Sequence, residues 1–331
     1  MAGPARADEN GLIARYFAPL AGPGADRMRD DAATLAPTPG HDLVLTADAL
    51  VAGVHHFPDD PPASIARKAL GVNLSDLAAK GATPRGILLT LALPDDWSED
   101  WLAAFSAGLG TATAEHGCPL LGGDTVRARG AMVIGVTALG EVPAGDMVRR
   151  VTARVGDRIC VTGTIGDAAL GLALRLEPEA PWIAALDDGM REYLRDRYLH
   201  PRPRLALAEA LRRHASAAMD VSDGLAGDCA KMLGEGRGAR IAADAIPLSA
   251  AAARAVRAEP ALIERILTGG DDYEILCTVP DSALDALRAE AAAVGVPLAV
   301  VGTVTSGDGP PAFEMGDGTA RVFAAGAFSH F

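Results

Sequence analysis

Apolar residues recur at helical or strand spacing along most of the chain, and these patterns predict alternating helices and strands. Between residues 65 and 80, Ile65, Ala69, Val72 and Leu77 fall on one face of a helix, with Ser64 as its N-cap. We predict further helices over 98–115, 203–214 and 281–294 and from Asp167, and strands over 43–45, 86–93, 131–139, 158–162, 273–279 and 298–304. Such mixed elements indicate an α/β or α+β protein.

A stretch rich in Gly, Pro and Arg interrupts this pattern at residues 140–157. The chain has 331 residues, which exceeds what one hydrophobic core usually holds. We therefore expect two domains, residues 1–145 and 146–331.

Charge and composition exclude several classes of protein. The net charge of −13 argues against nonspecific binding of nucleic acid, which needs a basic surface. No apolar run is long enough to cross a membrane, and Asp8 and Glu9 precede any apolar stretch, unlike in a signal peptide. The four cysteines are far apart and form no CxxC, so we expect buried thiols and a cytoplasmic protein. None of the three lysines stands in the Gly-Lys-Ser/Thr context of a Walker loop.

Acidic residues stand beside small or hydroxyl residues in five short segments, each at the edge of an apolar run. Carboxylates repeated at the ends of elements are typical of oxygen-ligand sites for Mg²⁺. The pattern indicates a protein that handles phosphates through metal ions. The segments are Arg29–Asp31, Thr46–Asp48, Asn73–Asp76, Gly122–Thr125 and Asp220–Gly224.

Each segment also has a plainer interpretation. Asp30-Asp31 suits a solvated turn, and Gly122–Thr125 suits either a tight turn or a close approach of the backbone to a ligand. Asp76 on an apolar helix suits a ligand, because an unpaired buried carboxylate is costly, or else a salt bridge to Lys68 or Lys80.

The remaining polar segments leave similar alternatives. A helix N-cap explains Ser222 or Asp223 but not Asp220. The adjacent His55 and His56 have poor chelating geometry, so one of them contacts a phosphate or ring, or lies exposed in a loop. No Ser/His/Asp or Cys/His nucleophile can be assembled, which favours catalysis by positioning and electrostatics.

Two further segments fit the same picture. Arg149-Arg150 is either a solvated pair or a phosphate clamp. Residues 269–274 again join glycines to acidic residues.

Taken together, these segments resemble the thiamine-monophosphate kinase family, of the superfamily that includes aminoimidazole ribonucleotide synthetase. The likeness covers nearly the whole chain, and the combination of its motifs is more specific than any one of them. The matching stretches are Leu12–Phe17 (LIARYF), Asp30–Ala33 (DDAA), Thr46–His55 (TADALVAGVH), Lys68–Lys80 (KALGVNLSDLAAK), Leu121–Thr125 (LGGDT), Val161–Asp167 (VTGTIGD), Asp220–Leu225 (DVSDGL) and Gly269–Leu276 (GGDDYEIL).

The resemblance implies a direct in-line transfer of the γ-phosphoryl group of ATP to thiamine phosphate, giving thiamine diphosphate as the last step of its biosynthesis. Donor and acceptor both carry several negative charges, so several Mg²⁺ ions bridging phosphates and carboxylates suit this chemistry. An acceptor phosphate is already ionised near neutral pH, so no strong general base is needed.

The resemblance also implies the roles of particular residues. Gly123, Arg150 and Ser222 contact ATP, and His55, Asp271 and Phe328 contact thiamine phosphate. The implied Mg²⁺ ligands are Asp30, Thr46, Asp48, Asp76, Asp124, Asp220 and Asp223.

Three positions depart from the family pattern. Asp271 replaces a Glu that contacts the substrate, and its shorter side chain leaves a gap that a water can span. Arg29 replaces a Gly before the acidic pair. Ala325 stands where a Trp is common, which leaves Phe328 as the aromatic expected against the thiamine.

The implied architecture is a two-domain PurM-like fold. N-terminal strands from two subunits form a barrel across a homodimer interface, in the domain that binds ATP and Mg²⁺, and a C-terminal α/β domain follows. One rival interpretation is another ATP-using member of the superfamily with a different acceptor. Its selenophosphate branch wants a reactive Cys near the N-terminus, whereas the first one here is Cys118. The other rival is a non-catalytic metal-binding or nucleotide-sensing dimer, which the presence of all seven oxygen ligands disfavours.

Overall fold

The computed structural model describes residues 8–323 and divides the chain into two compact units. Unit 1 comprises Met1–Leu77 and Thr83–Gly145, and unit 2 comprises Ala78–Ala82 and Asp146–Phe331. The unit boundary near residue 145 falls inside the Gly/Pro/Arg-rich stretch, whereas the segment Ala78–Ala82 leaves unit 1 in the middle of its sequence.

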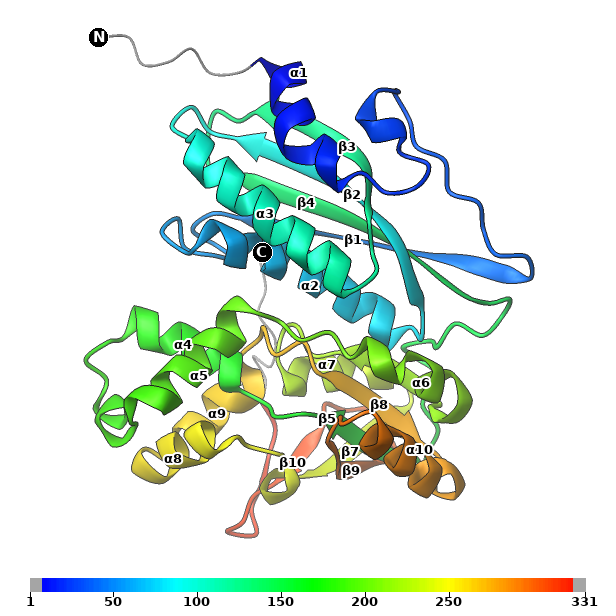
Figure 1. The fold of residues 1–331 in the computed structure, drawn as a ribbon. Helices are drawn as coiled ribbons and strands as arrows, with labels where there is room; N and C mark the ends of the chain where they lie inside the picture. The colour runs from blue at the N-terminus through cyan, green and yellow to red at the C-terminus, as the bar shows by residue number, and fades with distance from the viewer. Residues whose placement is uncertain (1–7, 324–331) are drawn as a thin grey trace. The chain divides into compact units, whose positions relative to one another are not determined.

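Unit 1 is built on a four-stranded sheet in the order β1-β4-β2-β3 (Figure 1). Strands β1 and β2 both pair antiparallel with β4, while β2 and β3 are parallel. The two parallel strands are joined through a helix, as parallel strands require. The bounds are β1 His41–Val51, β2 Thr83–Leu93, β3 Leu120–Arg127 and β4 Val133–Pro143.

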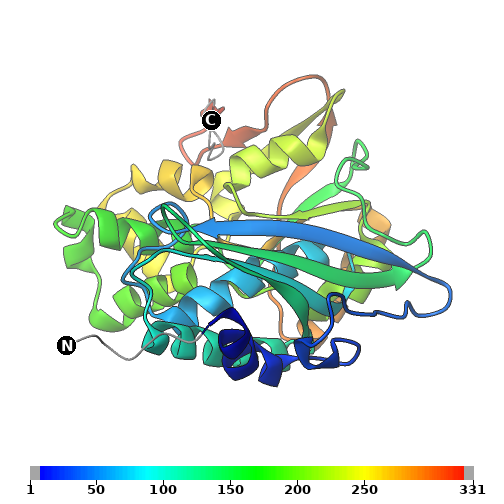
Figure 2. The same ribbon diagram turned by 90° about the horizontal axis from the view of Figure 1, so that it is seen from above.

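Helices α2 (Pro62–Ala79) and α3 (Glu99–Glu115) lie on one face of this sheet (Figures 1 and 2). Along β2, Leu89 and Leu91 are buried, while Leu88 between Ile87 and Leu89 is 40% exposed. Successive strand side chains point to opposite faces, so this alternation marks one packed face and one open face. The short α1 (Glu9–Leu12) precedes a π-helical turn and two 3₁₀ turns at Ile13–Phe17, Ala18–Leu20 and Asp26–Met28.

The open face of the unit 1 sheet carries large apolar side chains. Leu43 and Leu45 of β1 are 41% and 61% exposed, and Val126 of β3 is 44% exposed. A sheet face of this composition is unusual for a surface that stays in contact with water.

Unit 2 contains a seven-stranded sheet in the order β11-β10-β7-β9-β5-β8-β6, in which only β10 and β7 pair in parallel. Both sheets are open within the part of the chain that the structure describes. The bounds are β5 Arg158–Thr162, β6 Ala217–Asp220, β7 Arg237–Ala242, β8 Ile275–Val279, β9 Leu298–Ser306, β10 Ala312–Glu314 and β11 Ala320–Arg321.

The central strands of unit 2 are apolar on both faces because helices cover both sides of the sheet. On β8, Leu276 belongs to one buried cluster, while Ile275 and Cys277 belong to another. Strand β5 alternates in the same way, with Ile159 in the first cluster and Cys160 in the second. A strand buried on both faces reads as a continuous apolar run, which is why the sequence predicts β5 over the observed residues.

The helices of unit 2 surround this sheet (Figure 1). None of the helices in the described residues is both long and apolar enough to span a membrane. Their bounds are α4 Asp167–Leu176, α5 Asp188–Leu199, α6 Ala208–His214, α7 Leu225–Leu233, α8 Ala250–Ala258, α9 Leu262–Thr268 and α10 Asp281–Ala293, with 3₁₀ turns at Pro181–Ala185, Leu205–Leu207 and Ala243–Ala245.

Three local predictions are wrong. Helix α2 begins at Pro62, so Ser64 lies inside its first turn rather than at its N-cap. Strand β1 extends over eleven residues, so Thr46 and Asp48 lie within it and not at its end. The predicted helical turn before Ala208 is a 3₁₀ turn.

Candidate functional site

Two predicted ligands of unit 1 meet where β1 lies against α2. The Thr46 hydroxyl donates to Asp76 Oδ2 at 2.5 Å. The backbone N–H of Asp48 donates to Asn73 Oδ1 at 2.9 Å. Because β1 is an edge strand, Asn73 satisfies a backbone donor that no neighbouring strand reaches. The hydrogen-bond partner of Asp76 is thus Thr46, rather than Lys68 or Lys80.

Gly123 and Asp124 lie on β3, at the opposite edge of the same sheet. The segment Gly122–Thr125 is part of a strand, so the tight turn considered from the sequence is absent. A Cβ on Gly123 would overlap the carbonyl oxygen of Leu89, so the glycine lets β3 approach β2. Three interstrand steps of about 4.8 Å separate β1 from β3, which places Asp124 far from Thr46 and Asp48.

Asp30 and His55 occupy loops of unit 1. Asp30 is exposed in a bend, where its carboxylate accepts the backbone N–H of Asp31. His55 is half-buried, and its Nδ1 accepts the N–H of Val51 at 3.0 Å. This hydrogen bond needs a lone pair on Nδ1, so the ring proton sits on Nε2 and makes that atom the donor. His56 is buried, and burial lowers the pKa of its imidazole.

In unit 2 the structure joins the two loops predicted to contact ATP and thiamine phosphate. The N–H of Asp271 donates to the carbonyl of Ser222, and the N–H of Tyr273 donates to that of Val221, both at 2.8 Å. Gly270 lies so close that a Cβ there would overlap the Ser222 carbonyl oxygen. Asp271 and Tyr273 have φ of 73° and 50°, which non-glycine residues rarely adopt. The contacts with the Asp220–Gly224 loop hold this backbone in place.

Asp223 does not cap α7, since the N-cap position is Gly224 and no side chain bonds there. Instead, the fully buried Asp228 accepts the N–H groups of Ser222 and Asp223 at 3.0 and 2.9 Å. Lys231 donates to Asp228 at 2.8 Å and to Asp223 at 2.5 Å. Desolvation raises the pKa of Asp228, although Lys231 and the backbone donors oppose that effect.

A buried network of ion pairs lies directly after residues 269–273, which we call the Asp271 loop. Glu274 is fully buried and pairs with Arg197 at 2.9 Å and with Arg204, while Thr162 donates to it at 2.7 Å. Arg197 also donates to the carbonyl of Asp272, so the network holds the loop backbone itself.

Asp272 ties the same loop to helix α4. Its carboxylate accepts the N–H of Gly166 at 2.7 Å and that of Ala168 at 3.4 Å, next to the start of the helix. Complete burial raises the pKa of Asp272 well above its ordinary value. These structural contacts account for the side chains of Asp272 and Glu274 without a ligand.

The remaining predicted residues are placed as follows. Asp220 is buried at the end of β6. Arg150 is exposed, and the carbonyl of its neighbour Arg149 accepts the N–H of Ala218 on that strand. Phe328 lies outside the described residues.

The donor atoms gathered in each unit are carboxylate and hydroxyl oxygens, which suit Mg²⁺. In residues 8–323, however, no three His, Cys, Asp or Glu side chains are close enough together to hold a metal ion. The structure thus brings together Thr46 with Asp76, and Ser222 with Asp223 and Asp271, but it does not assemble a complete coordination shell in either unit.

The four cysteines form no disulfide. All four are free and buried, as predicted, and burial raises the pKa of Cys118 and of Cys229 to about 12. A thiol with such a pKa is not a nucleophile near neutral pH.

Sequence reasoning missed Asp228, Lys231 and the arginines around Glu274. For the first two a signal exists, because an Asp and a Lys three residues apart share one face of a helix. Arg197 lies in α5 and Arg204 in the segment after it, both far from Glu274 in the sequence.

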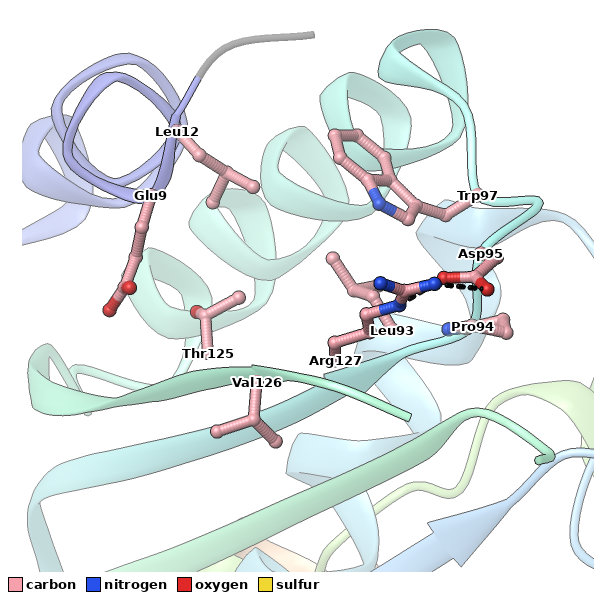
Figure 3. Close-up of a pocket in the computed structure, with 9 residues that line it drawn as sticks. All are labelled: Glu9, Leu12, Leu93, Pro94, Asp95, Trp97, Thr125, Val126 and Arg127. Carbon is pink, nitrogen blue, oxygen red and sulfur yellow. Dashed lines mark hydrogen bonds and ion pairs between the residues drawn. The ribbon is translucent and has the colours of Figure 1, made fainter. Parts of the chain in front are cut away.

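A separate pocket of about 550 Å³ lies in unit 1 (Figure 3). Its walls combine apolar side chains with an ion pair between Arg127 and Asp95. None of the predicted site residues lines this pocket, although Thr125 follows Asp124 in β3.

The chain is similar to known proteins over nearly its whole length. The AIR synthase related protein family matches through its N-terminal domain over residues 29–142 and through its C-terminal domain over residues 154–312. The thiamine-monophosphate kinase of Caulobacter vibrioides is 41% identical over 312 residues, which cover 92% of this chain and 86% of that protein.

Solved structures agree with these similarities. The crystal structure of thiamine-monophosphate kinase from Stenotrophomonas maltophilia K279a has a TM-score of 0.79 at 40% identity, covering 89% of this chain and 91% of that one. A structure of AaThiL complexed with AMPPCP and TMP has a TM-score of 0.76 at 29% identity and covers 91% of both chains.

Proposed function

Because this chain belongs to the thiamine-monophosphate kinase family, we propose that it transfers the γ-phosphoryl group of ATP to thiamine phosphate, giving ADP and thiamine diphosphate. The observation that carries this proposal in the structure is the hydrogen bond between Asp271 and Ser222. It holds the residue proposed for thiamine phosphate beside the residue proposed for ATP, as a transfer between two phosphates requires.

The roles of the residues follow from their chemistry. Arg150 offers a guanidinium that can bind two phosphate oxygens at once, and Ser222 offers a hydroxyl. His55 presents an Nε2–H donor to thiamine phosphate, while Gly123, next to Asp124 on β3, contacts ATP. Asp271 and Phe328 contact the thiamine phosphate.

Asp30, Thr46, Asp48, Asp76, Asp124, Asp220 and Asp223 are the proposed ligands of several Mg²⁺ ions. When bound, Mg²⁺ supplies neutralisation of the charge that accumulates on the phosphate oxygens. The separation of Asp124 from Asp48 across the sheet fits more than one ion. The acceptor phosphate is already ionised, so the protein positions both substrates for in-line attack and needs no strong base.

We also propose that two copies form a homodimer through the open face of the unit 1 sheet. Exposed Leu43, Leu45, Leu88 and Val126 on that face support a barrel closed by two subunits. Leu45→Glu is expected to give a monomer in size-exclusion chromatography with light scattering. Val155 of unit 2, with a similar exposure of 59%, provides the control Val155→Glu. A dimer that survives Leu45→Glu would exclude this interface.

A role in thiamine diphosphate biosynthesis supports a cytoplasmic location for this enzyme. The four buried cysteine thiols fit that location, because the cytoplasm keeps thiols reduced.

The direct test is to incubate the protein with ATP, Mg²⁺ and thiamine phosphate and to follow thiamine diphosphate by chromatography. Thiamine and precursors of aminoimidazole ribonucleotide serve as alternative acceptors. Product from thiamine phosphate alone is the expected result. Product only from another acceptor would assign the chain to a different reaction of the superfamily.

A further inference from the structure

We propose that Lys231 is a built-in counter-ion of Asp223, which holds this carboxylate ready in the metal-free protein and releases it when a divalent cation binds. The inference rests on the proposed function, because it takes Asp223 as a metal ligand.

The geometry of Lys231 places one ammonium between two carboxylates. Its Nζ lies 2.5 Å from Asp223 Oδ2 and 2.8 Å from Asp228 Oδ1. The side chains of Lys231 and Asp223 are 37% and 36% exposed, whereas Asp228 is fully buried. Asp223 therefore faces the solvent side of this arrangement and Asp228 the protein side.

The carboxylates of Asp228 and Asp223 have different structural roles. Asp228 accepts the N–H groups of Ser222 and Asp223, so it fixes the backbone of the loop. Within the described residues, no backbone donor is bonded to the carboxylate of Asp223, which pairs with Lys231. The bond from Lys231 to Asp223 can therefore break while Asp228 and the loop backbone stay in place.

A divalent cation and an ammonium compete for the same oxygen. A metal ion that binds Asp223 Oδ2 at Mg²⁺ distances of about 2.1 Å leaves no room for Nζ at hydrogen-bond distance on that lone pair. Lys231 has a flexible stem and a second partner in Asp228, so it can turn away without leaving a buried charge unpaired.

The scarcity of lysine makes this position notable. The chain has three lysines among 30 basic residues, and all three bond to segments that carry predicted site residues. Lys68 donates to the carbonyl of His55, and Lys80 donates to that of Ala218 on β6. Lys231 pairs with the carboxylate of a proposed ligand, Asp223.

The test measures Mn²⁺ binding by electron paramagnetic resonance in Lys231→Met, without nucleotide and with AMPPCP. Loss of the competing ammonium is expected to tighten Mn²⁺ binding by about threefold to tenfold. Arg257→Met is the control, because it removes one positive charge at an exposed position of α8. Equal shifts in the two variants, or weaker binding in Lys231→Met, would overturn the inference.

Asp223→Asn separates this inference from the proposed function. It is expected to weaken Mn²⁺ binding, and adding Lys231→Met to it should then change nothing. Unchanged Mn²⁺ binding in Asp223→Asn would remove Asp223 from the metal ligands and so contradict the proposed function at this residue. Should Lys231→Met fail to fold, Lys231→Gln keeps a donor for Asp228, lacks the charge and carries the same expectation.

Discussion

The acidic residues of unit 1 and those of unit 2 are supported in different ways. In unit 1, Asp48 and Asp124 project from edge strands and are exposed, and the sheet is their main support. In unit 2, the Asp220–Gly224 loop is held by Asp228 and Lys231 on one side and by the Asp271 loop on the other. The first arrangement places carboxylates on the exposed surface of strands, and the second surrounds them with a hydrogen-bonded frame.

Because of this difference, substituting an acidic residue of the site in unit 1 should lower activity without lowering stability. Substituting a residue of the frame in unit 2 should lower both. An exposed carboxylate on a strand adds little to folding, since water solvates it in either state. A buried charge that loses its partner is costly, so the frame of unit 2 is part of the folding core.

The largest expected effect is on activity in unit 1. Asp48→Asn or Asp124→Asn should lower kcat by about 10³-fold, because each removes a charged metal ligand without changing its shape. The urea midpoint should stay at the wild-type value. Asp96→Asn, at an exposed position outside the predicted site, is the matched control. Wild-type turnover in both variants would refute the metal assignment.

The next effect is on stability in unit 2. Glu274→Gln should lower the free energy of unfolding by about 3–5 kcal/mol, because it leaves Arg197 and Arg204 without a buried anion. Urea denaturation measures the loss. Glu177→Gln provides the comparison, since its pair with Arg265 is half-exposed and worth about 1 kcal/mol or less. Equal losses in both variants would show that burial of the pair does not matter.

A smaller, pH-dependent effect sharpens the comparison within unit 1. Burial alone would raise the pKa of Glu141, but hydrogen bonds from Thr38 and the charge of Arg85 outweigh it and lower the pKa. A lowered pKa stabilises the fold above the ordinary value of 4.5, and this contribution fades as the pH falls through the folded-state pKa. Glu141→Gln should cost about 1–2 kcal/mol at pH 7. Urea curves repeated down to acid pH should show this difference shrinking, and a constant difference would contradict the assignment.

The smallest effect is expected at the pocket in Figure 3. Arg127 and Asp95 form an exposed bidentate pair, with side chains 75% and 66% exposed. Arg127→Met should leave the free energy of unfolding at the wild-type value within the error of measurement, because solvent screens such exposed pairs. Thermal unfolding measures it, and a larger loss would show that the pocket contributes to folding.

The sequence predicts much of the fold. The mixed α/β content and the two-domain PurM-like fold are confirmed, and β5 agrees in both bounds because its residues are buried on both faces. Helix α3 was predicted one residue too long only because its N-cap, Ser98, was counted in it. The barrel across a dimer interface stays a prediction.

The failures have identifiable physical causes. Pro62 at the first helical position is the signal for the start of α2 that the Ser64 assignment overlooked. The segment around Gly123 resembles a turn because glycines are common in turns, yet here the glycine allows two strands to approach.

The candidate site was predictable only in part. The local motifs predict that Thr46 and Asp76 are both Mg²⁺ ligands. The hydrogen bond between them, however, depends on how β1 packs on α2. The Glu274 network joins residues seventy or more positions apart in the sequence, and no local pattern encodes such a pairing.

The scarcity of lysine has a practical consequence for experiments on this enzyme. Lys68 is buried, so an amine-directed acylating reagent would find few targets among its side chains. Lys231 is partly accessible and changes partner in the proposed switch, so its labelling, read by mass spectrometry of peptides, would serve as a footprint of cation occupancy at Asp223.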